Sequence, residues 1–209
     1  MSTQQPNERD ELRAARDELD ARTRELAQSE QRYRDLEAHK REFYQQTILA
    51  ATDGRLVIEE RDAIRAMAGS SLADWTVDTA VGLARIREEA VALADSLGMD
   101  QLGILRLATC IGEATSNALK HAGGGKASLY KLPDSVLFEV EDHGPGIGAL
   151  SIPHLALSAG YSTAGTLGMG YKLMILSASK VYLATGPDGT TVACEIALRN
   201  DDPAAQPTA

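Results

Sequence analysis

The sequence predicts an α+β protein, a two-layer α/β sandwich preceded by an N-terminal α-helical coiled coil. Three observations lead to this fold class. Residues 8–46 are dense in charge, contain no Gly or Pro, and repeat leucine every seven residues. Residues 78–122 carry helical patterns, and after residue 125 the apolar period changes to two. Two or three helices beside such strands are expected to pack against one mixed or antiparallel sheet.

The composition argues against nucleic acid as a binding partner. The chain has 209 residues, a hydrophobic fraction of 44% that can support a core, and a net charge of -9. This negative charge disfavours binding to phosphate backbones. One Trp and 4% aromatic residues offer few stacking surfaces for single-stranded nucleic acid. We therefore expect no nucleic-acid partner.

The N-terminus and the cysteines indicate a cytoplasmic protein with no membrane contact. Residues 1–20 are polar and lack the apolar region of a signal peptide. No run approaches the roughly 18 apolar residues that a membrane span requires. Cys110 and Cys194 lie inside apolar patterns, so we expect two buried thiols in a reducing compartment. The scattered histidines suggest no metal cage.

The N-terminal segment is predicted to be a helical coiled coil over residues 8–50, after a disordered stretch at 1–7. One row of the heptad is apolar, with Leu12, Leu19, Leu26 and Tyr33. The second row is mixed, with Ala15, Arg22, Ser29, Leu36 and Phe43. This pattern predicts a short or imperfect coiled coil that forms a homodimer or connects to another module. A solvated single helix is the alternative.

Residues 51–74 are expected to be a connecting segment with one short strand. Asp53-Gly54 is a turn signal, and Leu56 to Ile58 is a short β-like run. The main domain is then expected over residues 75–199. Its first long helix ends near Gly98, and the next opens around Asp100.

The second half of the domain is predicted to be mostly strand. Residues 126–132 and 135–144 are expected to form adjacent strands, joined by a Pro-Asp turn. A helix begins near Gly170. Residues 180–198 are expected to form a hairpin whose turn is Pro-Asp-Gly. One face of its second strand carries Val192, Cys194, Ile196 and Leu198. The tail, 200–209, is expected to be disordered.

The helix after Asp100 carries two separate stripes. Its apolar stripe consists of Ile104, Leu107, Ala108, Ile111, Ala114 and Ala118, and its polar stripe of Arg106, Glu113, Asn117 and Lys120. A carboxylate and an amide one turn apart, at Glu113 and Asn117, can hold a hydrated cation or orient a water. Mg²⁺ suits such oxygen ligands, and Lys120 could reach a phosphate. The alternative is a helix side that merely faces solvent.

Two glycine-rich stretches could bind a nucleotide. In the first, a strand ends at Asp142 and runs into Gly144 and Gly146, which allow close backbone approach to a flat ligand. A carboxylate at that edge can accept a hydrogen bond from an exocyclic amine such as that of adenine. In the second, Gly168 and Gly170 precede an apolar helix and can present backbone N–H groups to phosphate. This stretch does not have P-loop spacing.

Taken together and in this order, these motifs resemble those of Bergerat-type ATPases. This superfamily includes gyrase-like ATPase domains, a heat-shock chaperone family, histidine kinases and anti-sigma serine kinases. The matching series is Glu113-x-x-x-Asn117-Ala-x-Lys120-His121, Asp142-x-Gly144-x-Gly146-Ile147, Gly168-x-Gly170 and Gly189-Thr190-Thr191. It covers roughly residues 75 to 198. The stretch 160–174 looks most similar to the lid of anti-sigma-factor serine/threonine protein kinases.

The resemblance implies a role for each matching residue, with ATP and Mg²⁺ as cofactors. Asn117 would coordinate Mg²⁺ that bridges the ATP phosphates, and Glu113 would be the general base. Asp142 would bind the adenine amine, supported by the Thr191 hydroxyl. The remaining implied binding residues are Gly144, Gly146 and Ile147 at the adenine pocket, Lys120, Gly168 and Gly170 at the phosphates, His121 in a supporting role, and Ser162 and Thr163 in a mobile lid.

The implied activity is that of a serine/threonine protein kinase, whose substrate would be a small antagonist-type regulatory domain. The lid lacks the arginine often found before its glycines in sigma-sequestering members, and the compact members lack the coiled coil. A partner other than a sigma factor therefore fits equally well. Two alternatives stay open. One is a histidine kinase that is phosphorylated at His39, although Lys40-Arg41-Glu42 is not the usual context. The other is a nucleotide-gated interaction module without phosphoryl transfer.

Overall fold

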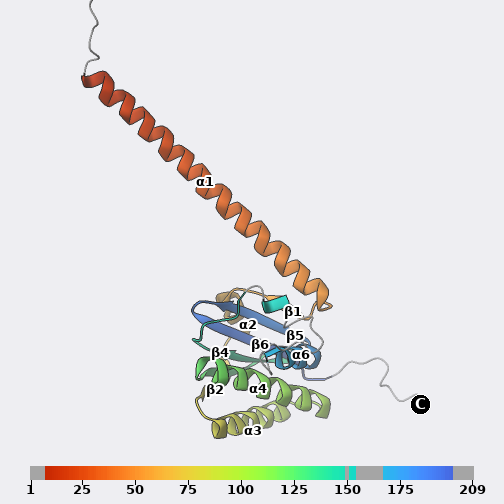
Figure 1. The fold of residues 1–209 in the computed structure, drawn as a ribbon. Coiled ribbons are helices and arrows are strands. Elements are labelled where there is room, and N and C mark those ends of the chain that lie inside the picture. The colour runs from red at the N-terminus through yellow and green to blue at the C-terminus, as the bar shows by residue number, and fades with distance from the viewer. Residues whose placement is uncertain (1–7, 149–150, 154–166, 200–209) are drawn as a thin grey trace, which may run out of the picture. The chain divides into compact units, whose positions relative to one another are not determined.

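The computed structural model describes residues 8–148, 151–153 and 167–199 (Figure 1). Within these ranges the chain forms five helices and six strands. It divides into two compact units, 1–46 and 47–209, which are described separately. The termini expected to be disordered lie outside the described residues, as do Ser162 and Thr163 of the expected lid.

The described part of the first unit is a single long helix. Helix α1 spans Glu8–Ala51, and its last turn belongs to the second unit. The long N-terminal helix is therefore confirmed. The heptad row of Leu12, Leu19, Leu26 and Tyr33 is more than 60% exposed at every position. Neither α1 nor any other helix in the described ranges is both long and apolar enough to cross a membrane.

The second unit is built on one mixed sheet of six strands (Figure 1). The strand order is β1 (Leu56–Ile58), β5 (Lys180–Gly186), β6 (Gly189–Ala197), β4 (Ser135–Glu141), β3 (Gly125–Lys131) and β2 (Ser71–Val77). Among the strands that the structure describes, only the edge pair β1 and β5 is parallel, and the other four pairs are antiparallel. The expected α+β sandwich is confirmed, including the short first strand and the last hairpin.

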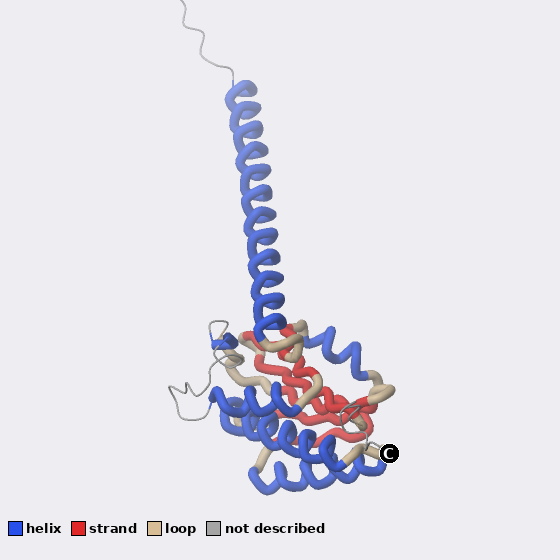
Figure 2. Tube along the Cα trace, turned by 90° about the vertical axis from the view of Figure 1, so that its right-hand side faces the viewer, coloured by secondary structure: helices blue, strands red, loops and turns tan. Residues whose placement is uncertain are grey.

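Helices α3 (Ala80–Ser96), α4 (Gln101–Ala122) and α6 (Leu167–Ser177) pack together on one face of the sheet (Figures 1 and 2). Local signals set their ends. The Asp100 side chain caps α4 by accepting the Gly103 N–H at 2.6 Å, which confirms the expected start. Gly123 ends α4 in the left-handed conformation, at φ 76°.

The core lies between these helices and the sheet. Helix α4 supplies Leu107, Ile111 and Ala114, which are at most 1% exposed. Phe138 of β4 is fully buried and lies 6.5 Å from the Trp75 ring, centroid to centroid. Cys110 and Cys194 are buried free thiols, as expected. A hydrogen bond with Cys110, and then burial, raise the pKa of the Cys194 thiol, which favours its neutral form.

The opposite face of the sheet is partly covered by a helix that the sequence analysis did not predict. Helix α2 (Arg61–Ala68) packs Ile64 and Ala68 against Leu137, Ala184 and Ala193 of the sheet. Residues 51–74, expected to be a connection with one strand, thus contain β1, α2 and the start of β2. The helix escaped prediction because its eight residues are fewer than the roughly 11 from which a helical period is read, although its apolar side chains lie on one face.

Asp74 on β2 organises a polar cluster at the edge of the sheet. Its carboxylate accepts hydrogen bonds from Ser128 at 2.6 Å and Ser71 at 2.8 Å, and it pairs with Lys126 at 3.0 Å. The Ser128 bond, followed by those of Lys126 and Ser71, lowers the pKa of Asp74 to about 2 from 3.8. The folded state therefore favours the ionised carboxylate.

We expect Asp74→Asn to destabilise the fold at neutral pH but not at low pH. Because the folded-state pKa lies below the unfolded value, the stabilisation is complete above about pH 4 and is lost as the pH falls toward 2. Asp74 is 43% exposed, so solvent screening limits the loss at pH 7 to about 1 kcal/mol. Urea unfolding between pH 7 and pH 2.5 measures this difference. Asp188→Asn in the exposed β5–β6 turn is the control, and a pH-independent deficit in Asp74→Asn would contradict the prediction.

Candidate functional site

A cavity of about 300 Å³ opens where α4 ends, β4 runs into its glycine loop, and α6 and β6 begin. Its walls therefore come from segments that are far apart in the sequence. The lining residues are Asn117, His121, Asp142, Gly144, Pro145, Gly146, Ile147, Gly148, Ser151, Tyr171 and Thr190. Six of the residues expected at a nucleotide site are among them: Asn117, His121, Asp142, Gly144, Gly146 and Ile147.

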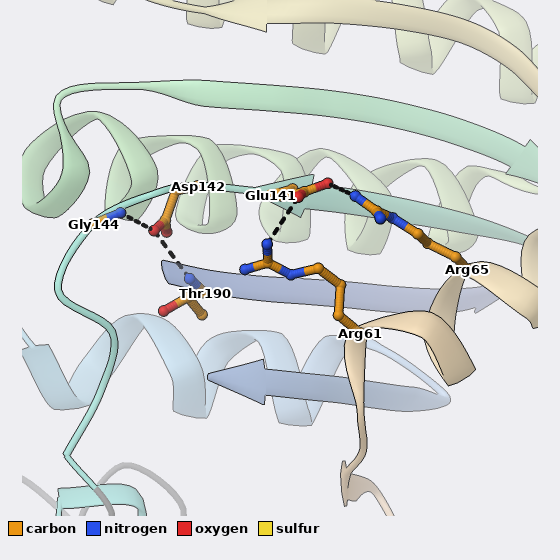
Figure 3. Close-up of polar contacts among 6 residues, drawn as sticks. All are labelled: Arg61, Arg65, Glu141, Asp142, Gly144 and Thr190. Atoms are coloured by element: carbon orange, nitrogen blue, oxygen red, sulfur yellow. Dashed lines mark hydrogen bonds and ion pairs between the residues drawn. The ribbon is translucent and has the colours of Figure 1, made fainter. Parts of the chain in front are cut away.

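Asp142 is held at the end of β4 by backbone groups (Figure 3). Its Oδ1 accepts the Gly144 N–H at 2.9 Å and the Thr190 N–H at 3.1 Å. Its own N–H donates to the Thr190 carbonyl at 2.8 Å. Both side-chain bonds use Oδ1, so Oδ2 has a fixed position and can accept a hydrogen bond from a ligand. This arrangement suits recognition of an amine on a flat base.

The glycines around Asp142 permit backbone approaches that any side chain would block. A Cβ on Gly146, where φ is 71°, would lie 2.0 Å from the Gly186 carbonyl oxygen. A Cβ on Gly189, where φ is 118°, would lie 2.0 Å from the Asp142 carbonyl oxygen. The loop is also fixed by Ile147, whose N–H donates to Thr185 Oγ1 at 2.7 Å. The glycine motif thus shapes the cavity wall.

The polar stripe of α4 leads from the cavity to the start of α6. Asn117 lines the cavity, and Glu113 lies one helical turn earlier and is partly buried. A Cβ on Gly170 would lie 2.6 Å from Glu113 Oε2 and 3.6 Å from Asn117 Nδ2. The absence of a side chain at Gly170 therefore lets α6 approach the carboxylate and the amide together. This contact joins two motifs that the sequence analysis had linked only by resemblance.

Not all expected phosphate-binding residues reach the cavity. Lys120 is exposed in the last turn of α4 and does not line the cavity. A cation in that turn instead interacts favourably with the negative end of the helix dipole. Gly168 lies in the first turn of α6, where backbone N–H groups have no partner within the helix.

The structure corrects the expectation for Thr191. Thr190, and not Thr191, lines the cavity. Thr191 is fully buried, and its Oγ1 has no hydrogen-bond partner among the described residues. Successive strand residues point to opposite faces, so a shift of one position moves a side chain to the other side of the sheet. The apolar row of Val192 and Cys194 already indicated the register, because Thr190 continues that row.

Tyr171 is a cavity residue to which the sequence analysis gave no role. It follows Gly170 on α6 and is 5% exposed. Burial, and then the nearby Asp142 carboxylate, raise the pKa of its hydroxyl, which therefore stays protonated at neutral pH. Its ring supplies an apolar wall for a planar ligand, with Ile147 also lining the cavity.

The residues present fit a metal ion that is shared with a ligand. Within the described ranges, no group of three or more His, Cys, Asp or Glu side chains could hold a metal alone. The amide of Asn117 lines the cavity one helical turn from the Glu113 carboxylate, and its oxygen suits Mg²⁺ that keeps waters and phosphate oxygens. A nucleotide would complete this donor set.

Comparison with solved structures found a similar chain in a histidine kinase domain from Erythrobacter litoralis EL346, described as a blue-light activated histidine kinase. The sequence identity is 20% and the TM-score is 0.36. The match covers 64% of this chain and 72% of the solved one. A comparison with curated proteins found no match.

The family described as "Histidine kinase-like ATPase domain" matches residues 76–196. The match includes α3, α4 and every residue that lines the cavity, and it spans more than half of the 209 residues. The chain therefore belongs to the histidine kinase-like ATPase domain family.

Proposed function

We propose that this chain is an ATP-dependent regulatory serine/threonine protein kinase whose substrate is a small antagonist-type regulatory domain. The observation that carries the proposal is one cavity bounded by the fixed carboxylate of Asp142 and by Asn117, with Glu113 meeting α6 beside it. These groups would bind the two ends of a nucleoside triphosphate. Family membership supports a kinase-like use of that nucleotide.

The adenine would occupy the end of the cavity formed by Asp142, Gly144 and Gly146. Asp142 Oδ2 would accept the exocyclic N–H of the base, because Oδ1 already accepts two backbone bonds. Thr190 would take the supporting role first expected of Thr191, since it donates its N–H to Asp142 and lines the cavity. Tyr171 and Ile147 would pack against the base.

The phosphates would lie toward Asn117 and the first turn of α6. The Asn117 side-chain oxygen would hold Mg²⁺, which supplies charge neutralisation on the phosphates when bound. Backbone N–H groups near Gly168 and Gly170 would donate to phosphate oxygens, as helix N-termini commonly do. His121 lines the same cavity and would assist from the end of α4.

Glu113 would be the general base for transfer to a hydroxyl. It lies one turn from Asn117 and within reach of the α6 terminus, where the terminal phosphate is proposed to lie. Its carboxylate would accept the proton of the attacking Ser or Thr hydroxyl as the phosphorus–oxygen bond forms, while the nucleoside diphosphate leaves. In the absence of a protein substrate, a water molecule could take the position of the attacking hydroxyl.

A histidine kinase is the second candidate, and one contact favours it. His39 is exposed on α1, and its Nδ1 lies 2.7 Å from the Asp35 carbonyl oxygen. If Nδ1 donates this bond, Nε2 is the free nucleophile. His39 belongs to the first compact unit, whereas the proposed ATP site belongs to the second. The chemical stability of the transferred phosphate separates the two candidates.

Helix α1 would make the protein a homodimer. Its exposed row of Leu12, Leu19, Leu26 and Tyr33 has the seven-residue spacing that pairs with an identical row of a second copy. Dimerisation would bury these side chains and would present two ATP-binding units for each assembly.

Replacing Asn117 with alanine is expected to weaken Mg²⁺-dependent ATP binding. The affinity should fall by at least about 10-fold, because even the mutation of residues that only support a metal ligand commonly lowers metal affinity by that factor. Calorimetric titration with and without Mg²⁺ measures the effect. Gln101→Ala removes an exposed amide from the same helix and should bind as wild type. Equal binding by the Asn117 and Gln101 variants would exclude Asn117 from the site.

Glu113→Gln is expected to bind ATP normally and to lower phosphoryl transfer by roughly 10²- to 10⁴-fold, the range for loss of a general base. Transfer is measured with radiolabelled ATP, and Glu88→Gln, an exposed change on α3, is the control. A product that is stable in acid supports Ser or Thr phosphorylation. An acid-labile phosphate on the chain itself, lost in His39→Ala, would favour the histidine kinase.

Leu26→Lys is expected to weaken the dimer by about 10-fold or more, because it places a charge in the apolar seam. Gln31→Lys introduces the same side chain five positions later, outside the heptad rows, and should leave the dimer intact. Sedimentation equilibrium of both variants and the wild type gives the dissociation constants. A monomeric wild type would instead support the solvated single helix.

A further inference from the structure

Two arginines of α2 converge on one carboxylate beside the proposed adenine site (Figure 3). Arg61 Nη1 lies 3.0 Å from Glu141 Oε1, and Arg65 Nη2 lies 2.5 Å from Glu141 Oε2. The Glu141 side chain is only 13% exposed, and each of its two oxygens is paired with one arginine. Hydrogen bonds between an arginine and a carboxylate are charge-assisted and are about twice as strong as those between neutral groups.

Glu141 is the last residue of β4 and immediately precedes Asp142. Neighbouring residues of a strand point to opposite faces, so Glu141 faces α2, whereas Asp142 lines the cavity on the side of α4 and α6. Glu141 therefore does not line the cavity and would not touch a nucleotide there. The direct route from Glu141 to the base-recognising carboxylate is the backbone that Glu141 and Asp142 share.

That backbone controls where the Asp142 carboxylate lies. Glu141 pairs with Thr191 in the β4–β6 register, and Asp142 exchanges bonds with the adjacent Thr190. Gly125 of β3 is also close, because a Cβ there would lie 2.2 Å from the Glu141 carbonyl oxygen. A small movement of Glu141 would therefore alter both bonds that hold Asp142 Oδ1.

Helix α2 is itself anchored, so it can hold Glu141 in place. Ile64 and Ala68 pack on the sheet, and Ile64 is fully buried. The strand before it, β1, pairs with β5. Arg65 also faces the buried Glu139, whose pKa is raised by burial and then by the charge of Glu141. The arginines thus offset two neighbouring carboxylates and keep Glu141 against α2.

The geometry points to Glu141 as a positioning residue for Asp142, with α2 setting adenine recognition through Arg61 and Arg65. This inference rests on the proposed ATP site and adds to it. Adenine affinity would depend on where α2 lies, although α2 is on the other face of the sheet. The segment that links the N-terminal helix to the domain would in this way tune nucleotide selectivity.

The test compares ATP with purine riboside 5′-triphosphate, which lacks the exocyclic amine. Both are titrated against the full chain in Mg²⁺, and the ratio of the two dissociation constants measures the amine contact alone. The wild type should prefer ATP by about 10-fold or more, the effect of one hydrogen bond to a charged group. Glu141→Gln and the double variant Arg61→Ala/Arg65→Ala should each lower this ratio by at least about 3-fold, with little change in analogue affinity.

Glu195→Gln is the matched control. Glu195 also lies on the α2 face of the sheet and accepts bonds from Ser135 and Tyr182, but it is near the other end of β6. It should keep the wild-type ratio. The conservative Arg61→Lys should retain more selectivity than Arg61→Ala. Thermal unfolding without nucleotide identifies a variant that fails to fold, and the arginine variants then carry the test because they leave Glu141 in place.

Each outcome separates this inference from the proposed function. If the wild type binds neither triphosphate, the proposed ATP site itself is excluded. A wild type that binds both equally would leave the site but overturn the inference, because no amine contact would exist to be positioned. A selective wild type whose Glu141 and arginine variants remain equally selective would also overturn it. If the variants lose affinity for both triphosphates by the same factor, Glu141 has a structural role only and the inference is overturned.

Discussion

The close approach of three strands around Glu141 and Asp142 is the constraint on which the site depends. On one side, Gly125 of β3 leaves room for the Glu141 carbonyl, and on the other, Gly189 of β6 leaves room for the Asp142 carbonyl. Both approaches are closer than any side chain allows. They bring the Thr190 N–H to the Asp142 carboxylate, and a cavity residue is thereby fixed by backbone groups and not by flexible side chains.

The two faces of the sheet present different chemical environments at Glu141 and Asp142. On the α4 and α6 side, Asp142 and Thr190 line a cavity with an apolar wall that includes Tyr171. On the α2 side, Glu141 is paired with two arginines and a buried Glu139 lies nearby. The strand period places consecutive residues on these two faces. Residues that line the cavity and residues that anchor α2 therefore lie on opposite faces. The backbone between Glu141 and Asp142 connects the two sets.

Helix α4 combines core packing with site chemistry by using different faces. Leu107 and Ile111 fix the helix against the sheet, and this fixes in turn where Glu113 and Asn117 lie. The contact with Gly170 then brings α6 to both polar groups. A side chain at Gly170 would require the Glu113 carboxylate to move away from its place beside α6. The proposed phosphate end of the site therefore depends on a contact between α6 and side chains of α4, whereas its base end depends on backbone contacts between strands.

The sequence by itself determined the features whose causes are local. The spacing of Glu113 and Asn117, the cap at Asp100, the alternation in β4 and β6, and the glycines after Asp142 all follow from helix, strand and turn periods. Only the tertiary structure decided which of these groups meet. It showed that Gly170 lies against Glu113, that Lys120 stays outside the cavity, and that α2 holds Glu141. These are contacts between distant segments, which depend on packing and have no local period. Thr190 lies between the two cases: the strand alternation indicated its face, but the cavity that gives this face its importance exists only in the folded chain.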